Sequence, residues 1–250
     1  GYMGGGSDGT TTKQDFWEYD PVNNVWTQKA NYGGGQRQLA VAFALGGKGY
    51  VGTGLDATNT EKSDFWQYDP ANNTWTQKAN IGGVARHNAA AFTVGAFGYV
   101  GTGASGSNVL NDFWRYDPSL NQWVQKANYG GGLRHRATAF SINGTGYVCC
   151  GVGSGGALNS DVWAYSPGGN TWSQKANFGG PARNGAVAMT MGNFAYVGTG
   201  FNQNISQSGL QDMWQYDPAF DSWTQKTNAP NATRSACAFT SFQAIWRVIG

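Results

Sequence analysis

The sequence predicts an all-β fold in which one four-stranded unit is repeated five times along 250 residues. The motif Asp-x-Trp-x-Tyr recurs at intervals of 48 to 51 residues, a second tryptophan follows nine residues later, and an arginine follows eleven residues after that. Short strand-like runs fill each period, and no helical pattern lies between them, which excludes a helical solenoid. The paired tryptophans are Trp17 and Trp26, Trp66 and Trp75, Trp114 and Trp123, Trp163 and Trp172, and Trp214 and Trp223.

Each period contains four predicted strands in a fixed order. The first is a run of small and apolar residues after the arginine, as at residues 39–43. The second reads Tyr-Val-Gly-Thr-Gly at residues 50–54 and is degraded to Tyr-Val-Cys-Cys-Gly at 147–151 and Tyr-Met-Gly-Gly-Gly at 2–6. The third is the Asp-x-Trp-x-Tyr strand, and the fourth begins at the second tryptophan. Because turn signals separate these short runs and no helical pattern lies between them, we expect strands rather than helices.

The turn between the third and fourth strands can be read directly. Residues 20–24 are Asp-Pro-Val-Asn-Asn and residues 69–73 are Asp-Pro-Ala-Asn-Asn. Aspartate supplies a side-chain acceptor, proline presets φ for a type I turn, and asparagine tolerates a positive φ afterwards. The third and fourth strands are therefore predicted to form a tight hairpin.

Four antiparallel strands per unit at a period close to 50 residues indicate a β-propeller. The arginine before the first strand, the tyrosine and glycine of the second, the Asp-x-Trp-x-Tyr-Asp-Pro strand and the following tryptophan resemble the kelch-repeat family over essentially the whole chain. The resemblance implies kelch-type blades. It departs from the family where the usual adjacent glycine pair is replaced by Gly-Thr-Gly, as at residues 52–54.

The strand count predicts five blades in a single domain that covers residues 1–250. Pairing residues 234–242 with residues 1–30 would close the ring and leave no unpaired edges. Residues 244–250 look like a sixth, corrupted second strand, so a truncated six-bladed ring is the alternative. The repeat units are placed near residues 1–36, 37–85, 86–133, 134–182 and 183–233.

The composition excludes several classes of partner. Lys plus Arg is 16 against 14 for Asp plus Glu, so a net charge of +2 provides no basic field for nucleic acid or an anionic membrane surface. The longest apolar stretch, residues 39–45, is far shorter than the roughly 20 residues of a membrane-spanning helix. We therefore expect neither nucleic-acid binding nor membrane insertion. Only 12% of residues are charged and 39 are glycine, a composition that favours an extracellular or cell-surface location.

The cysteines predict neither a disulfide framework nor a zinc site. There are three of them, Cys149, Cys150 and Cys237, without CxxC spacing. We expect them to be small buried hydrophobic residues. No metal or cofactor is predicted.

One face of the propeller is the predicted ligand-binding face. The loops from strand 4 to strand 1 share that face with the loops from strand 2 to strand 3, which vary most in sequence and are therefore expected to carry specificity. The loops from strand 2 to strand 3 are residues 7–14, 55–63, 104–111, 154–160 and 201–211. The repeated arginines on the same face are Arg37, Arg86, Arg134, Arg183 and Arg234.

These arginines have two interpretations. A ring of guanidinium groups near the channel rim offers paired donors to carboxylates or sugar hydroxyls. Alternatively, each arginine forms a structural pair with the aspartate before the third strand and ties the blades together. Those aspartates are Asp15, Asp64, Asp112, Asp161 and Asp212. His87, His135 and Arg136 are not repeated in every blade, so they are the stronger functional candidates on this face.

The predicted function is a non-catalytic recognition or scaffold module that binds a glycan or an acidic protein segment on the arginine-rimmed face. A propeller that spaces flanking domains of a longer chain is a further possibility. The kelch resemblance also implies an enzyme alternative. A copper radical oxidase would need two imidazoles and two tyrosines on copper, a pattern not matched here residue by residue. A sialic-acid mutarotase would need a carboxylate and a histidine converging with arginines, for which Asp56 or Glu61 is the acid candidate.

Overall fold

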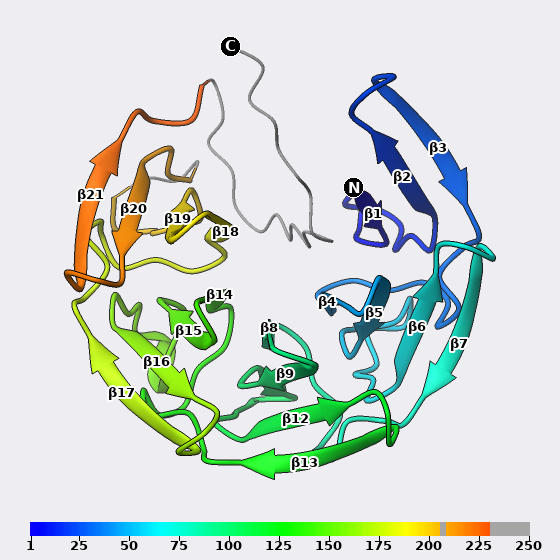
Figure 1. Cartoon of the computed structure of the whole chain (residues 1–250), viewed down its shortest axis with the longest axis horizontal. Coiled ribbons are helices and arrows are strands. Elements are labelled where there is room, and N and C mark those ends of the chain that lie inside the picture. The colour runs from blue at the N-terminus through cyan, green and yellow to red at the C-terminus, as the bar shows by residue number, and fades with distance from the viewer. Residues whose placement is uncertain (206–208, 231–250) are drawn as a thin grey trace.

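The computed structural model describes residues 1–205 and 209–230, and it confirms the predicted all-β propeller. Five antiparallel sheets are arranged around a central axis as the blades of the propeller (Figure 1). Four of the blades have four strands each, and the first has three strands within the described residues. The described ranges contain one helical segment, the short 3₁₀ turn η1 (Ser154–Gly156).

The blades follow one another in chain order. Blade 1 consists of β1 (Tyr2–Gly4), β2 (Phe16–Asp20) and β3 (Val25–Lys29). Blade 2 consists of β4 (Val41–Leu45), β5 (Lys48–Gly52), β6 (Phe65–Asp69) and β7 (Thr74–Lys78). Blade 3 consists of β8 (Ala90–Val94), β9 (Phe97–Gly101), β12 (Phe113–Asp117) and β13 (Gln122–Lys126). Blade 4 consists of β14 (Thr138–Ile142), β15 (Thr145–Cys149), β16 (Val162–Ser166) and β17 (Thr171–Lys175). Blade 5 consists of β18 (Val187–Met191), β19 (Phe194–Gly198), β20 (Met213–Asp217) and β21 (Ser222–Lys226).

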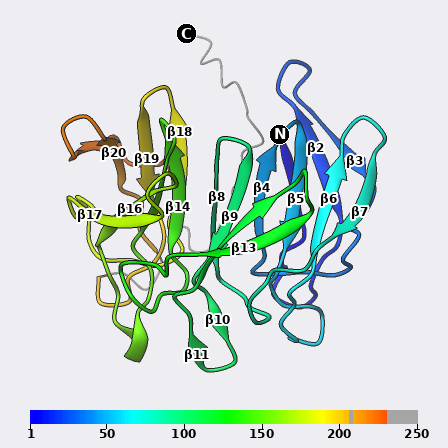
Figure 2. The same ribbon diagram turned by 60° about the horizontal axis from the view of Figure 1, so that its bottom comes forward.

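Within each complete blade the first strand is innermost and the fourth is outermost, with consecutive strands paired (Figures 1 and 2). The variable loops project from one face of the ring, where the loop of blade 3 forms a small hairpin of β10 (Ala104–Ser105) and β11 (Asn108–Val109). The hairpin between the third and fourth strands forms as predicted. In blade 2, Asp69 Oδ1 accepts a hydrogen bond from Ala71 N at 3.0 Å, and Asn73 adopts φ 53°.

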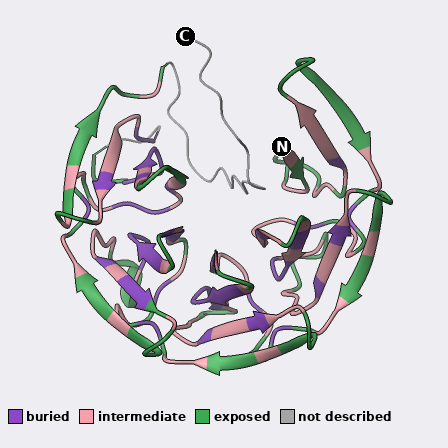
Figure 3. Cartoon of the chain, viewed as in Figure 1, coloured by how far each residue is buried: buried purple, intermediate pink, exposed green. Residues whose placement is uncertain are grey.

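The hydrophobic core lies mainly between neighbouring blades. Phe65 of blade 2 is fully buried, and its ring meets that of Trp123 in blade 3 with centroids 4.9 Å apart in an edge-on arrangement. Tyr50 and Tyr116 make a second contact of this kind across the same interface. Figure 3 shows that burial is concentrated on the inner strands, while the outermost strands are largely exposed. Large aromatic side chains therefore hold the blades together by edge-to-face packing.

The outer edges of neighbouring blades are also joined by hydrogen bonds. Asn73 Oδ1, in the turn of blade 2, accepts the amide of Ala30 in blade 1 at 2.8 Å. Trp75 Nε1 donates to the Ala30 carbonyl oxygen at 3.0 Å. The same two bonds recur at the next three junctions, with aspartate replacing asparagine at the last. Their residues are Asn121 and Trp123 with Ala79, Asn170 and Trp172 with Ala127, and Asp221 and Trp223 with Ala176.

The predicted ring closure by residues 234–242, the candidate sixth strand at 244–250, and Cys237 lie outside the described residues. Blade 1 has no first strand within the described ranges. Trp26 is 50% exposed, which is more than its equivalents in the other blades. In the part of the chain that the structure describes, none of the helical segments is long and apolar enough to cross a membrane.

Candidate functional site

The repeated arginines are buried beside the aspartates of the third strands. Arg37, Arg86, Arg134 and Arg183 are 3%, 0%, 2% and 0% exposed, respectively. Each guanidinium donates two hydrogen bonds to one carboxylate. In blade 3, Arg86 Nη1 and Nη2 lie 2.6 Å from the two oxygens of Asp112, and Arg86 Nη1 also donates to the Thr102 carbonyl oxygen at 3.0 Å. The equivalent carboxylates belong to Asp64, Asp161 and Asp212.

These pairs support the structural interpretation of the four described arginines. Burial alone would raise the pKa of Asp112, but the hydrogen bonds and charge of Arg86 outweigh it and hold that pKa below its ordinary value. Arg86 and Asp112 both belong to blade 3, so the pair fixes one blade rather than joining two. Because their guanidinium groups are buried and already bonded, these arginines do not rim an open ligand-binding face as the first interpretation required. Arg234 lies outside the described residues.

A second ring of residues surrounds the mouth of the central channel. It consists of the residues two positions after each buried arginine, all with left-handed backbone: Leu39, Asn88 and Arg136 with φ 54°, and Gly185 with φ 60°. Asn88 N donates to the Leu39 carbonyl oxygen at 3.1 Å, Arg136 N to that of Asn88 at 2.9 Å, and Gly185 N to that of Arg136 at 3.0 Å. The main chains of four successive blades are thus joined around the mouth, and the side chains at these positions are not needed for the connection.

Arg136 is the exposed arginine of this ring. Within the described residues its guanidinium has no hydrogen bond and no ion pair, in contrast to the four buried arginines. His87 and His135 precede Asn88 and Arg136 in neighbouring blades, and both imidazoles are close enough to Arg136 to feel its charge. The structure therefore brings together the three unrepeated residues that the sequence singled out.

The imidazoles are held in the neutral form. Burial lowers the pKa of His87, and Arg136 adds to the effect against the opposing charge of Glu61. Burial, Arg136 and His87 lower the pKa of His135. His135 Nδ1 is buried without a hydrogen-bond partner in the described part of the chain. A neutral imidazole can donate or accept a hydrogen bond, so both rings can orient a polar ligand group.

Glu61, in the variable loop of blade 2, forms a cluster with His87, His135 and Arg136. Its Oε1 lies 3.5 Å from His87 Nδ1, which is too long for a strong hydrogen bond, and accepts the amide of Gly106 at 2.8 Å. The hydrogen bond from Gly106 lowers the pKa of Glu61. Glu61 therefore joins the loops of blades 2 and 3 beside the mouth. The sequence identified Glu61 as an acid candidate but gave no sign that it meets His87.

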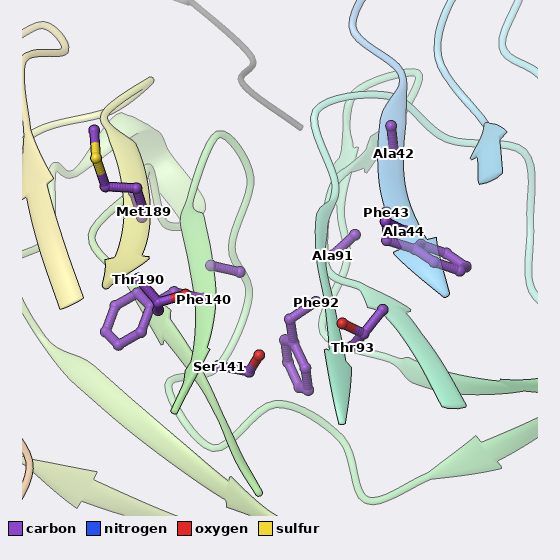
Figure 4. Close-up of a pocket in the computed structure, with 12 residues that line it drawn as sticks. Ala42, Phe43, Ala44, Ala91, Phe92, Thr93, Phe140, Ser141, Met189 and Thr190 are labelled. Atoms are coloured by element: carbon purple, nitrogen blue, oxygen red, sulfur yellow. The ribbon is translucent and has the colours of Figure 1, made fainter. Parts of the chain in front are cut away.

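Below the mouth lies an open channel. Four neighbouring innermost strands line it, β4, β8, β14 and β18, as Figure 4 shows. Each contributes an alanine at the same position, and the next residue but one is an alanine, threonine or serine such as Ala44, Thr93 or Ser141. None of the described residues that line the channel is charged, so among them the cluster of Arg136, His87, His135 and Glu61 supplies the charge at its mouth.

Asn88 is the mouth residue that sequence reasoning missed. It stands at the same distance after Arg86 as Arg136 does after Arg134, so an alignment of the repeats on their arginines would have marked both. Within residues 1–205 and 209–230, no group of three or more His, Cys, Asp or Glu side chains is placed to bind a metal ion.

Comparison with known proteins supports the fold alone. No protein-family model and no curated protein matches the chain. Among solved structures, the one described as the structure of YjhT superposes with a TM-score of 0.75 over 90% of this chain and 80% of that chain, at 15% sequence identity. At that identity the similarity shows a common propeller architecture and carries no function to this chain.

Proposed function

We propose that the chain is a recognition module that binds a carboxylate-bearing ligand at the mouth of the central channel. The observation that carries this proposal is the exposed Arg136, which has no partner in the described residues and lies beside two neutral imidazoles. A guanidinium group donates two parallel hydrogen bonds to a carboxylate, and a neutral histidine adds a further directed hydrogen bond. The ligand is a glycan with an acidic sugar or an acidic protein segment, which share this carboxylate chemistry.

The surroundings of Arg136 support a small anionic group rather than a long polyanion. The net charge of the chain is only +2, and Glu61 places a negative charge within the same cluster. A polyanion would bring several charges near Glu61 and be repelled, whereas a single carboxylate can pair with Arg136. The kelch-type blade, proposed here from the arginine, Tyr-Gly and Asp-x-Trp-x-Tyr pattern, provides a rigid frame with specificity in the variable loops. An extracellular location, where such ligands are abundant, is part of the same proposal.

The test is a binding screen with acidic oligosaccharides and short peptides that carry a single Asp or Glu, run at low and high salt. We expect saturable binding that weakens with salt, because the attraction is electrostatic. Arg136→Gln should reduce affinity at least about tenfold, the effect of losing one charged hydrogen-bonded contact. Lys226→Gln removes the same charge from the exposed outermost strand of blade 5 and is the matched control. Equal loss in both variants, or no binding to either ligand class, would overturn the proposal.

The contact between Glu61 and His87 favours one second candidate, a sugar-processing activity of the mutarotase type. A carboxylate beside an imidazole can relay a proton, and Arg136 could hold the acid group of a sugar. The test uses NMR to monitor the anomeric exchange of acidic sugars. Exchange that is accelerated by the protein and lost in Glu61→Gln, with sugar binding retained, would replace recognition by catalysis. Exchange at the uncatalysed rate would leave recognition as the function.

A further inference from the structure

Blade 4 contains two neighbouring buried cysteines that the ligand site does not use. Cys149 ends β15 and Cys150 follows it, where the other complete blades have glycine and threonine. The two residues are 0% and 1% exposed. Their Sγ atoms lie 3.0 Å apart, which makes each thiol the nearest reaction partner of the other.

The backbone explains why adjacent side chains meet. In an extended strand, successive side chains point to opposite faces. Cys150 instead adopts φ 65°, close to the values of Thr53, Thr102 and Thr199 at the same position of other blades, 60°, 60° and 57°. This left-handed residue breaks the alternation and turns the Cys150 thiol toward Cys149.

The opposite strand provides the space for the first thiol. In blades 2 and 3 the residue equivalent to Cys149 is glycine, paired with Phe65 or Phe113, and a Cβ there would collide with the phenylalanine ring. Cys149 pairs with Val162. The smaller valine leaves room for a side chain at residue 149. In blade 4 the smaller Val162 thus compensates for the larger side chain at residue 149.

We propose that Cys149 and Cys150 form a disulfide between neighbouring residues. The oxidant is a small disulfide of the glutathione class. One cysteine thiolate attacks that disulfide, forms a mixed disulfide and releases one glutathione thiolate. The second cysteine thiolate then attacks the protein sulfur and expels the other glutathione. Two protons and two electrons leave the protein, and one small disulfide is reduced to two thiols.

The fold determines when this reaction occurs. Burial raises the pKa of the Cys149 thiol well above its usual range, so the thiolate needed for attack is scarce once blade 4 is packed. Oxidation therefore takes place while the chain folds, and the finished disulfide is shielded from reductants. Adjacent Cα atoms are about 3.8 Å apart, closer than in most disulfides, so the bond is readily reduced when the blade unfolds.

The disulfide lies behind the ligand site. The Cys150 carbonyl oxygen accepts a hydrogen bond from Arg134 Nη1 at 2.7 Å, and Arg134 directly precedes His135 and Arg136. A closed ring would hold the peptide between Cys149 and Cys150 in one conformation, directly before the peptide that presents this carbonyl. The modification thereby stabilises the backbone that carries the residues of the channel mouth.

The test compares the full chain refolded in a mixture of oxidised and reduced glutathione with the chain refolded in dithiothreitol. Both samples are denatured in acid to stop exchange, and free thiols are labelled with a maleimide. The Cys237→Ala variant leaves only the two cysteines of interest. We expect no label after refolding in glutathione and two labels after dithiothreitol, and in the first sample the peptide containing residues 149 and 150 should be two hydrogen atoms lighter than its unlabelled dithiol form.

Cys150→Thr in the Cys237→Ala background restores the residue of the other blades, is the matched control and should take one label under both conditions. Peptide mapping of the unaltered chain gives the same answer if Cys237→Ala does not fold, because it identifies which cysteines are linked. Two labels after glutathione refolding, a glutathione adduct as the final product, or a link from either cysteine to Cys237 would overturn the proposal.

Discussion

Trp75 Nε1 in blade 2 donates a hydrogen bond to the carbonyl oxygen of Ala30, the residue that follows the outermost strand of blade 1. The Trp75 ring also packs against Phe16 of blade 1, with centroids 5.0 Å apart. One side chain thus joins two blades by a polar bond and an aromatic contact. Two further junctions have both contacts, through Trp123 and Trp172, and the junction at Trp223 keeps the hydrogen bond but has Val162 in place of the phenylalanine.

Replacing Trp75 should strongly destabilise the propeller. We expect Trp75→Ala to reduce the free energy of unfolding by about 3–5 kcal/mol, since a large half-buried ring and its hydrogen bond are both lost. Trp26→Ala is the internal comparison, because Trp26 is half exposed and has no junction bond in the described structure. Its expected cost is about 1 kcal/mol. Urea denaturation measures both. Equal losses would mean that Trp26 packs against another blade in solution.

Removing a buried guanidinium should be costly as well. Arg86→Ala removes both guanidinium donors from the Asp112 carboxylate and leaves it only the bond from Trp114 Nε1. Breaking a buried pair in this way costs about 3–5 kcal/mol. Arg86→Lys keeps the charge but cannot form both bonds, so an intermediate loss is expected. Guanidinium chloride denaturation of the three proteins provides the comparison. A loss under about 1 kcal/mol for Arg86→Ala would show that the pair does not stabilise blade 3.

Asp15 and Arg234 offer a test of ring closure. Asp15 has the position of Asp112 in its own blade and accepts the equivalent bond from Trp17 Nε1 at 2.7 Å. Its arginine by the repeat is Arg234, outside the described residues. If residues 234–242 complete blade 1, the double-mutant cycle of Asp15→Ala and Arg234→Ala should give a coupling energy above about 1 kcal/mol, as for contacting charges. The cycle of Asp64→Ala and Arg37→Ala is the positive control. Additive effects at Asp15 and Arg234 would contradict closure.

Arg136 should strengthen ligand binding while it lowers the stability of the folded chain. A left-handed conformation costs a residue other than glycine about 1 kcal/mol, and Gly185 shows that glycine fits this position in blade 5. Arg136→Gly is therefore expected to increase stability by about 1 kcal/mol while it weakens binding of acidic ligands. Thermal unfolding and a binding titration on the same sample decide the point. A less stable variant would show that Arg136 serves the fold.

The two histidines should make stability depend on pH below about 7. Both have folded-state pKa values below the ordinary value of about 6.5, so the folded state favours the neutral ring. Their contribution is complete above pH 6.5 and declines as the pH falls below it, because the unfolded chain takes up protons first. Denaturation curves across this range measure the slope. The double variant His87→Asn with His135→Asn should flatten it, and an unchanged slope would assign the dependence to other groups.

The repeated parts of the molecule were predicted well from the sequence, because equivalent residues make the same packing contacts in each blade. The four strands, the Asp-Pro turn and the pairing of arginine with aspartate all follow from that regularity. The sequence predicted less about the mouth of the channel. Arg134 and Arg136 have the same chemistry and lie two residues apart, yet one is buried and the other exposed, since the left-handed backbone at Arg136 reverses the direction of its side chain. The meeting of Glu61 with His87 depends on how two irregular loops approach, which periodicity does not encode.

The exchange of glycine and phenylalanine for Cys149 and Val162 has an evolutionary consequence. Returning residue 149 to glycine alone would leave a void over the valine, and placing phenylalanine at residue 162 alone would drive its ring into the cysteine. Each single step is unfavourable although the double step is neutral in volume. Because of this epistasis, blade 4 cannot revert to the sequence of the other blades one substitution at a time, and it is free to diverge further from them.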